Sequence, residues 1–443
     1  MSKNLNPEQS FIELPSPRKI PFGEVIAVSL SASTNTTTHG LHRYPAKFIP
    51  QIPRWAISNY SALGDTVLDP FVGSGTTMVE ALSLSRAAIG VDLDPMACLI
   101  SEAKTSELDG QRLNLLASKL LSFVECPRTE LVIPLAGVSN FGHWFTEAAW
   151  SSLQALRSGI ERLPLSEAER AFFLVVFSSI LRIVSNADDQ TQKTYVSGTL
   201  KKVPPEVLPT FEKALNKAIA GMISLNGVSS REPAHVFNCS ATAIPLSDDS
   251  VDLIITSPPY LDSVDYMYNL MLEYFWLGSD VGVHSRADFN SLRKKTIGAK
   301  QPIQPLDIPD SIQHLIKLED VPAYRKAAIA PYFAGMALHF AEAARVLKPG
   351  GRYVLVVGNS RSQTGMVRVH DALIILAAEV GLNIEHAFGY RIRRHYMKFP
   401  RKGRGGIILV DWVITLRKGE AVDGVPHQLP FVDEQLAPDE VAH

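Results

Sequence analysis

The chain has 443 residues, of which 46% are hydrophobic and 20% charged, and its formal net charge is −2 at pH 7. This balance is typical of a globular protein and, at this length, predicts one large elaborated domain or two. No run of 18 apolar residues and no signal-peptide pattern occurs, so we expect no membrane contact. The near-neutral charge excludes a global basic field, so any nucleic-acid contact must depend on local positive charge.

The first forty residues are rich in Ser, Thr and Asn and predict a loosely ordered arm. An alternating pattern follows. Residues 65–72 predict a short buried strand and residues 76–84 a helix, and residues 88–92 and 95–104 repeat the pair. This order predicts an α/β fold built on a doubly wound parallel sheet.

The alternation stops after residue 105. Residues 106–232 contain several segments of helical period and predict a helical insertion, in which Ser166-Glu167-Ala168-Glu169 is a capping-box signature and residues 205–224 form a further helix. We therefore expect one α/β domain made of residues 1–105 and 233–420. A second, irregular insertion is expected at residues 262–330, and an acidic tail at residues 421–443 is expected to be disordered.

Within the second part of the domain, the apolar pattern predicts further elements. These are strands at 234–238, 251–256 and 353–357, a helix at 327–347 ended by Pro349-Gly350-Gly351, a helix at 370–380, and a late strand at Gly406–Thr415.

A glycine-containing loop, Asp69 to Thr77 (DPFVGSGTT), joins the first strand to its helix. Gly73 and Gly75 let a ligand approach the backbone, and the following helix offers unpaired N–H groups. The loop has neither the P-loop spacing nor G-x-G-x-x-G, so a pyrophosphate is not favoured. Asp92 ends the next strand, where a carboxylate can accept hydrogen bonds from a ribose diol. Together, the glycine loop and Asp92 predict a binding site for a nucleoside without phosphates, such as S-adenosylmethionine. The alternative is an ordinary tight turn followed by a capping aspartate.

The tetrapeptide Ser257-Pro258-Pro259-Tyr260 directly follows an apolar run. Two prolines fix φ and lack N–H groups, so they end the strand in a stiff corner that holds the flanking groups. The alternative is a surface turn.

With both pieces in view, the sequence resembles the amino-methylating DNA methyltransferases. Their signatures are F-x-G-x-G and (D/N/S)-P-P-(Y/F/W), present here at Phe71–Gly75 and Ser257–Tyr260. The stretch His42–Pro50 looks like a third family element, which helps enclose the methionine end of the cofactor. The resemblance implies a Rossmann-like methyltransferase sheet of seven strands with one antiparallel edge strand, for which Gly406–Thr415 is the candidate.

The resemblance also assigns the cofactor contacts. They fall on Tyr44, Pro45, Lys47, Phe48, Asp69, Pro70, Phe71, Gly73, Gly75, Thr76, Thr77 and Asp92. Many members have Gly-Asp-Ala on the strand ahead of the S-P-P-Y strand, with the acid touching adenine. Here that segment is Asn238-Cys239-Ser240-Ala241, so we expect Asn238 or Ser240 to replace the acid.

The target of such enzymes is an exocyclic amine whose lone pair is delocalised into the base. The site must localise that lone pair and aim it at the methyl sulfonium. The Ser257 side chain and the Pro258 carbonyl can accept the two amino hydrogens, Pro259 stiffens the corner, and Tyr260 can stack on a flipped base. Ring-carbon methylation needs a thiolate after proline, but Cys98, Cys126 and Cys239 all follow other residues. No metal is expected, because the twelve histidines form no ligand-spaced cluster.

The sequence thus predicts a cytoplasmic, S-adenosylmethionine-dependent DNA methyltransferase acting in restriction-modification or defence, with a separate endonuclease as a candidate partner. Members with Ser first in the tetrapeptide more often modify cytosine N4, so that atom is the predicted target. Three alternatives stay open: an adenine-N6 enzyme, an RNA base N-methyltransferase, and a non-catalytic nucleic-acid-binding protein of the same fold.

Contacts to double-stranded DNA are predicted for a local basic segment, RIRRHYMKFPRKGR, which has no acid. Its cations are Arg391, Arg393, Arg394, Lys398, Arg401, Lys402 and Arg404. A smaller patch is Ser291–Lys300, and the alternative for both is a solvated face.

Sequence recognition is assigned to the 106–232 insertion as a candidate target-recognition region, or to the 262–330 insertion near the base pocket. In the second, Asp262, Asp265–Asn269 and Tyr274 are candidate pocket walls or caps, whereas Phe275 and Trp276 are expected in the core.

Overall fold

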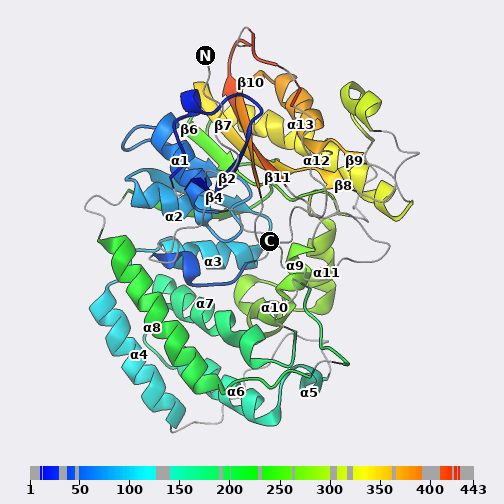
Figure 1. Cartoon of the computed structure of the whole chain (residues 1–443). Coiled ribbons are helices and arrows are strands. Elements are labelled where there is room, and N and C mark those ends of the chain that lie inside the picture. Colours follow the sequence, from blue (N-terminus) through cyan, green and yellow to red (C-terminus); the bar gives the residue numbers. More distant parts are fainter. Residues whose placement is uncertain are drawn as a thin grey trace.

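The structure is a computed structural model. It describes residues 10–11, 13–28, 37–44, 49–125, 140–188, 193–199, 201–227, 232–261, 265–299, 307–316, 323–361, 366–391, 410–421, 424–426 and 428–429. A nine-stranded sheet organises the described N- and C-terminal parts of the chain, in the order β1-β2-β10-β11-β7-β6-β3-β4-β5 (Figure 1). In chain order these strands are β1 (Ser10–Phe11), β2 (Val25–Val28), β3 (Thr66–Asp69), β4 (Ala87–Asp92), β5 (Ala234–Asn238), β6 (Val251–Thr256), β7 (Leu347–Gly358), β10 (Leu382–Arg391) and β11 (Val410–Lys418).

The sheet confirms the predicted Rossmann-like α/β fold. All neighbouring strands are parallel except β11, which is antiparallel to both β10 and β7. The seven strands from β10 to β5 form the expected sheet, and β2 and β1 extend it beyond β10. The two added strands were not predicted.

The predicted edge position of the antiparallel strand was wrong, because β11 lies between β7 and β10. The physical reason is visible in its side chains. Trp412, Val413 and Ile414 are successive residues, point to alternate faces of the sheet, and are all fully buried. A strand that is apolar on both faces needs cover on both faces and belongs in the interior of a sheet. Residues 406–409 of the predicted strand lie outside the described residues.

Helices cover both faces of the sheet. Leu253 and Ile255 of β6 belong to the same core as α1 (Gln51–Tyr60) and α2 (Thr76–Ser83), whereas Ile254 belongs to the core of α12 (Ala323–Val346) and α13 (Val369–Ala378). This alternation along one strand is what a doubly wound sheet requires. In the described part of the chain, no helix is long and apolar enough to cross a membrane.

A bundle of helices lies below the sheet in Figure 1 and comes mainly from the predicted helical insertion. Its helices are α4 (Gly110–Glu125), α5 (Phe141–Trp144), α6 (Glu147–Glu161), α7 (Glu167–Val184) and α8 (Val207–Asn226), joined by α9 (Tyr266–Asn269), α10 (Met271–Leu277) and α11 (Arg286–Lys294). The expected capping box of α7 is confirmed: Ser166 accepts from the Glu169 backbone N–H, and Glu169 accepts from that of Ser166.

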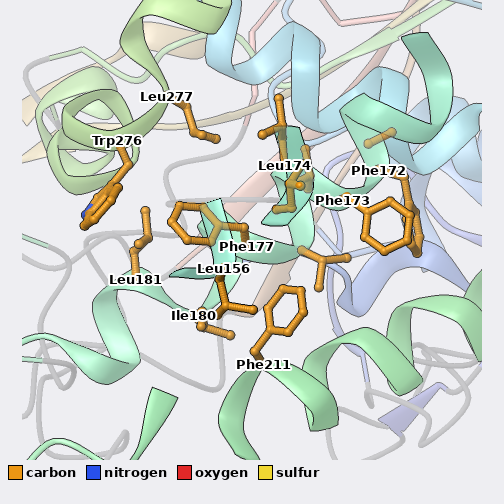
Figure 2. Packing of buried hydrophobic residues seen from close by; sticks show 14 of the residues in the cluster. Leu156, Phe172, Phe173, Leu174, Phe177, Ile180, Leu181, Phe211, Trp276 and Leu277 are labelled. Carbon is orange, nitrogen blue, oxygen red and sulfur yellow. The ribbon is translucent and has the colours of Figure 1, made fainter. Parts of the chain in front are cut away.

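Helix α7 is the centre of this bundle. Its side chains from Phe172 to Phe177 are all buried, as expected of a helix that is apolar on every side. Figure 2 shows Phe172, Phe173 and Phe177 of α7 among Leu156 of α6, Phe211 of α8 and Trp276 of α10. Helix α7 also packs on α3 (Pro95–Thr105), the helix that follows β4. The bundle core is therefore continuous with α3, which in turn packs on β4 and β5.

Several element predictions were wrong in detail. The N-terminal arm contains β2, whose Ile26 and Val28 are buried beside β10. The Pro349–Gly351 sequence does not follow the helix as a terminator; α12 ends at Val346, and residues 348–351 form an irregularity within β7, where the register to β6 shifts. Helix α1 and strand β10 were not predicted. Apart from residues 421, 424–426 and 428–429, the predicted tail lies outside the described residues.

Candidate active site

The predicted functional residues gather at one edge of the sheet. Strands β4, β3 and β6 are neighbours and run parallel, so the residues that follow them meet at the carboxyl edge. Asp92 ends β4, Asp69 ends β3, and Ser257 directly follows β6. Ligands of open α/β sheets bind at this edge.

Glycine is required twice in the loop after β3. Gly73 has φ +48°, and a Cβ there would lie 3.1 Å from Cε1 of Tyr44. Gly75 has φ +74°, and its Cβ would lie 3.2 Å from Cα of Ser101. Both residues use the left-handed region that L side chains rarely adopt. Tyr44, the described member of the third family element's predicted contacts, thus lies against the loop.

Asp92 ties this loop to the next strand. Its Oδ2 accepts from the Gly73 N–H at 2.9 Å, and its Oδ1 accepts from the Asp94 N–H at 2.9 Å. Burial, and after it the nearby charge of Asp94, raise the pKa of the Asp92 carboxyl to about 7. Each carboxylate oxygen has a second lone pair, so the side chain keeps the capacity to accept two hydroxyl donors.

A hydrogen bond couples the loop to the diproline corner. Thr256, the last residue of β6, donates from Oγ1 to Oδ1 of Asp69 at 2.6 Å, and the same oxygen accepts from the Phe71 N–H at 3.2 Å. Burial raises the pKa of Asp69 to about 6. The start of the glycine loop and the start of the corner are therefore held side by side.

The corner has internal hydrogen bonds of its own. The hydroxyls of Ser257 and Tyr260 are bonded to each other, and Tyr260 Oη donates to Oδ1 of Asp411 at 2.9 Å. Pro258 is buried, while Ser257 and Tyr260 are half-buried. The structure thus brings the predicted catalytic corner and cofactor loop together.

Comparisons with known proteins identify relatives of this chain. The family model described as a DNA methylase matches residues 3–103. The type II methyltransferase M.AvaI of Nostoc sp. is 30% identical over 418 residues, which cover 81% of this chain and 82% of that protein. M.MvaI of Kocuria varians is 26% identical over 408 residues, covering 84% and 86%. The chain belongs to the amino-methylating DNA methyltransferases.

Among solved structures, a methyltransferase from Methanosarcina mazei aligns with a TM-score of 0.32 and 11% identity, covering 85% of this chain and 99% of that one.

The methyltransferase uses S-adenosylmethionine as its cofactor. Its site fits a nucleoside, because Gly73 and Gly75 hold the loop backbone in the left-handed region without side chains and Asp92 supplies acceptors for a ribose. Thr76 and Thr77 are buried in the first turn of α2. The predicted contacts Pro45, Lys47 and Phe48 lie outside the described residues.

Asn238 and Ser240, the predicted substitutes for the adenine-contacting acid, have local partners. Asn238 Nδ2 donates to the carbonyl oxygens of Asp92 at 3.0 Å and Leu93 at 3.2 Å. Ser240 Oγ shares a hydrogen bond with Thr242 Oγ1 at 2.7 Å. Asn238 therefore braces the backbone that carries Asp92.

The predicted DNA contacts are described only in part. Arg391 is exposed at the end of β10 and pairs with Val410 of β11. The other six cations, Arg393, Arg394, Lys398, Arg401, Lys402 and Arg404, lie outside the described residues. In the smaller patch, Arg293 forms a bidentate ion pair with Asp265.

The expected pocket walls lie partly beside the corner, where Tyr266 Oη accepts from the Tyr260 backbone N–H at 3.5 Å, and partly in the core. Phe275 and Trp276 are buried in the bundle core, as predicted. Asp265 caps α9 by accepting from the Tyr268 N–H at 3.0 Å, and Asp262 lies outside the described residues. Tyr274 is buried, and its hydroxyl donates to Oδ1 of Asp94 at 2.5 Å. That bond links the second insertion to the N-cap of α3.

Sequence reasoning missed the residues that hold the site in place. Ser101 Oγ donates to the Gly73 carbonyl at 3.0 Å, and the fully buried Lys104 Nζ donates to the Ser74 carbonyl at 2.7 Å. Their spacing of three residues on one helix face was the available signal, because one helix can then reach successive carbonyls of a loop. Thr256 and Asp411 gave no such signal, since their partners are distant in sequence.

Proposed function

We propose that this methyltransferase transfers a methyl group from S-adenosylmethionine to the exocyclic N4 amine of cytosine in double-stranded DNA. The observation that carries the proposal is the Thr256–Asp69 hydrogen bond, because it joins the Ser257–Tyr260 corner to the cofactor loop. The type II relatives support a role in restriction-modification, with an endonuclease of the same target sequence as the expected partner.

The cofactor supplies an electrophilic methyl group on a sulfonium. The chain supplies its position: Gly73 and Gly75 admit the ligand to the backbone, Asp92 accepts the ribose hydroxyls, and Phe71 presents an aromatic face beside them. Phe71 is held by an edge contact with His339, at 4.8 Å between ring centroids. A fixed cofactor converts methyl transfer into an effectively unimolecular step.

The corner prepares the amine. Ser257 and the Pro258 carbonyl each accept one amino hydrogen, which localises the nitrogen lone pair, and Tyr260 stacks on the base. Acceptors that are already in position stabilise the charge that develops on the amine nitrogen. The cost of flipping the base, a few kcal/mol, is partly offset by that stacking.

Two features favour cytosine N4 over other targets. Ser257 provides a neutral acceptor at the first position of the tetrapeptide, the form that the resemblance associates with cytosine N4. A covalent ring-carbon mechanism has no support in the described thiols, because burial raises the pKa of both Cys98 and Cys239. Those thiols stay protonated and are poor nucleophiles.

The basic segment is the proposed phosphate-binding element. Its described flanks, Arg391 and Val410, are paired at the carboxyl edge, where Ser257 also lies. The 106–232 insertion is the proposed target-recognition region. We propose that phosphate contacts position the duplex and that the insertion reads its base edges.

Product analysis tests the proposal directly. Unmethylated duplex DNA is incubated with the protein and S-adenosylmethionine, then digested to nucleosides and analysed by mass spectrometry. N4-methylcytosine is the expected product. N6-methyladenine would overturn the base assignment, methylation of tRNA alone would overturn the DNA assignment, and binding without any product would indicate a non-catalytic protein.

A matched pair of serine variants tests the role of the corner. Ser257→Ala removes one acceptor of an amino hydrogen and should lower the methylation rate about 10²-fold, the usual effect of deleting one preorganised hydrogen bond. Ser247→Ala, at an exposed serine in the loop before β6, should leave the rate unchanged. Equal rates for both variants would contradict the role of Ser257.

A further inference from the structure

Asp411 lies at the junction of three strands. It is the second residue of β11, pairs in register with Tyr390 of β10 and Gly358 of β7, and is only 7% exposed. Because β11 runs antiparallel, its first residues lie at the carboxyl edge of its parallel neighbours. The carboxylate accepts from two phenols there: Oδ1 from Tyr260 at 2.9 Å and Oδ2 from Tyr390 at 3.0 Å. Asp411 belongs to neither signature motif of the family, and it is not among the contacts predicted from the sequence.

The hydrogen bonds at this point have a fixed direction. A carboxylate can only accept, so the Tyr260 proton is directed at Asp411. Burial raises the pKa of Tyr260 well above its ordinary value, and Asp411 raises it further, so the phenol keeps that proton. The bond between Ser257 and Tyr260 must then carry the serine proton, with the phenol oxygen as its acceptor.

This direction matters because a serine hydroxyl is ambiguous. It has one proton and two lone pairs, and it could present either to a ligand. An amine whose hydrogens are to be bound needs an acceptor. If the serine proton is donated to Tyr260, the lone pairs of Ser257 are left for the amine. An ionised aspartate in the first position of the tetrapeptide would need no such control, since it accepts in every orientation.

We propose that Asp411 is a positioning residue that fixes the hydrogen-bond chain Ser257→Tyr260→Asp411, so that Ser257 presents lone pairs to the target amine. The inference rests on the proposed role of Ser257 and holds for either target base. Tyr260 then has two roles, since its ring stacks on the base and its hydroxyl oxygen accepts the hydrogen bond that Ser257 donates. Tyr390 anchors the second carboxylate oxygen from the neighbouring strand.

A set of variants separates this role from a purely structural one. Tyr260→Phe keeps the ring and removes the acceptor for Ser257. Asp411→Leu removes both carboxylate oxygens at similar volume, and Asp411→Asn keeps one acceptor. Tyr60→Phe is the control, because Tyr60 is a half-buried phenol that accepts from Thr415 Oγ1 of the same strand β11, at 3.4 Å.

The measurement is the single-turnover methylation rate with duplex DNA and S-adenosylmethionine both saturating. We expect Tyr260→Phe and Asp411→Leu each to be slower by about tenfold or more, the effect of losing one well-placed hydrogen bond. Asp411→Asn should fall between Asp411→Leu and the unchanged protein, and Tyr60→Phe should match the unchanged protein. Dissociation constants for cofactor and DNA should change by less than about twofold.

The double variant Tyr260→Phe/Asp411→Leu is decisive. If Asp411 acts through the Tyr260 hydroxyl, the double variant is no slower than the slower single variant. Multiplied effects, or a normal rate for Asp411→Leu, would overturn the inference. Should Asp411→Leu unfold, Asp411→Asn takes its place in the cycle. A slow Ser257→Ala with normal Asp411 and Tyr260 variants defeats the inference alone, whereas a normal Ser257→Ala defeats the proposed role of the corner as well.

Discussion

Two buried aspartates, Asp69 and Asp94, and the half-buried Asp92 lie around the cofactor loop, and loss of solvent raises the pKa of each. Asp69 reaches about 6 and Asp92 about 7, and Asp94 is raised as well. Backbone N–H donors partly offset the cost of burial for all three. A ligand with hydroxyl donors would favour the ionised form of Asp92 further, so part of the cofactor's binding free energy compensates for a charge that is unfavourable in the unliganded protein.

Asp92→Asn should change the pH dependence of stability. The Asp92 pKa is raised from 3.8 to about 7, so between these values the folded protein binds a proton that the unfolded chain does not. The part of the free energy of unfolding that comes from this bound proton is therefore lost as pH rises from about 4 to 7. The variant should lose this pH dependence, which changes the free energy of unfolding by at most about 4 kcal/mol over the whole interval. It should also bind S-adenosylmethionine more weakly.

Urea unfolding from pH 5 to 8 and calorimetric titration with the cofactor measure both effects. Asp307→Asn, an exposed carboxyl remote in sequence from the loop, serves as the control and should keep the slope of the unchanged protein. An identical slope in Asp92→Asn would show that this carboxyl is not the group that titrates.

At this scale, the sequence predicted residues whose chemistry is local. Gly73, Gly75 and Asp92 were recognisable because the glycine loop and the end of the next strand lie within about 25 residues of each other in the sequence. Asp411 could not be recognised, because its partner Tyr260 is far away in the chain and only the antiparallel placement of β11 brings them together. Lys104 was not singled out either, because the Ser74 carbonyl that its ammonium group binds lies in the loop before another helix.

Among the elements, α7 has the most demanding environment. Phe177 is fully buried, and its ring makes an edge contact with Trp276 of α10 at 5.5 Å between centroids. Ile183 lies on the same helix but is 43% exposed. The helix therefore offers a buried and an exposed site of similar chemistry.

Phe177→Ala should lower the free energy of unfolding by about 3–5 kcal/mol, because it removes a large buried ring and leaves a cavity. Ile183→Ala should change it by no more than about 0.5 kcal/mol. Urea denaturation monitored by tryptophan fluorescence measures both. Similar losses in the two variants would contradict the central position of α7.

Elements with a clear local pattern were predicted well. Strands β5 and β6 have the predicted bounds, and the capping box placed the start of α7. The position of β11 within the sheet could not be predicted in the same way, because an apolar run predicts a strand but not which strands lie beside it. Strand β2 was hidden because its four residues are flanked by polar sequence, and only pairing with β10 makes it part of the sheet.

For the molecule as a whole, described basic residues lie at both edges of the sheet. The flanks of the basic segment lie at the carboxyl edge, whereas Lys348 and Lys418 lie at the opposite edge, in ion pairs with Asp252 and Asp249. We propose that the carboxyl edge, where Ser257 also lies, faces the phosphates.

Changing Arg401 and Lys402 together to Gln should weaken DNA binding and flatten its salt dependence. Each lost phosphate contact lowers the slope of log K against log salt concentration by about 0.9, so the pair should lower it by about 1.8. Changing Lys348 and Lys418 to Gln removes the same charge at the other edge and should leave the slope unaltered. Fluorescence anisotropy at several salt concentrations measures it, and equal effects would refute the assignment.

The pairing of β2 with β10 has a consequence for how the chain folds during its synthesis. Val25 and Ile26 leave the ribosome early, but their partners Gly389 and Tyr390 are made near the end of synthesis. Contacts between such distant segments form slowly, and unpaired apolar strands attract other chains in the meantime. We expect the N-terminal strand to join last, so a nascent chain stopped before residue 382 would carry Ile26 and Val28 without their β10 cover and depend on chaperones to stay in solution.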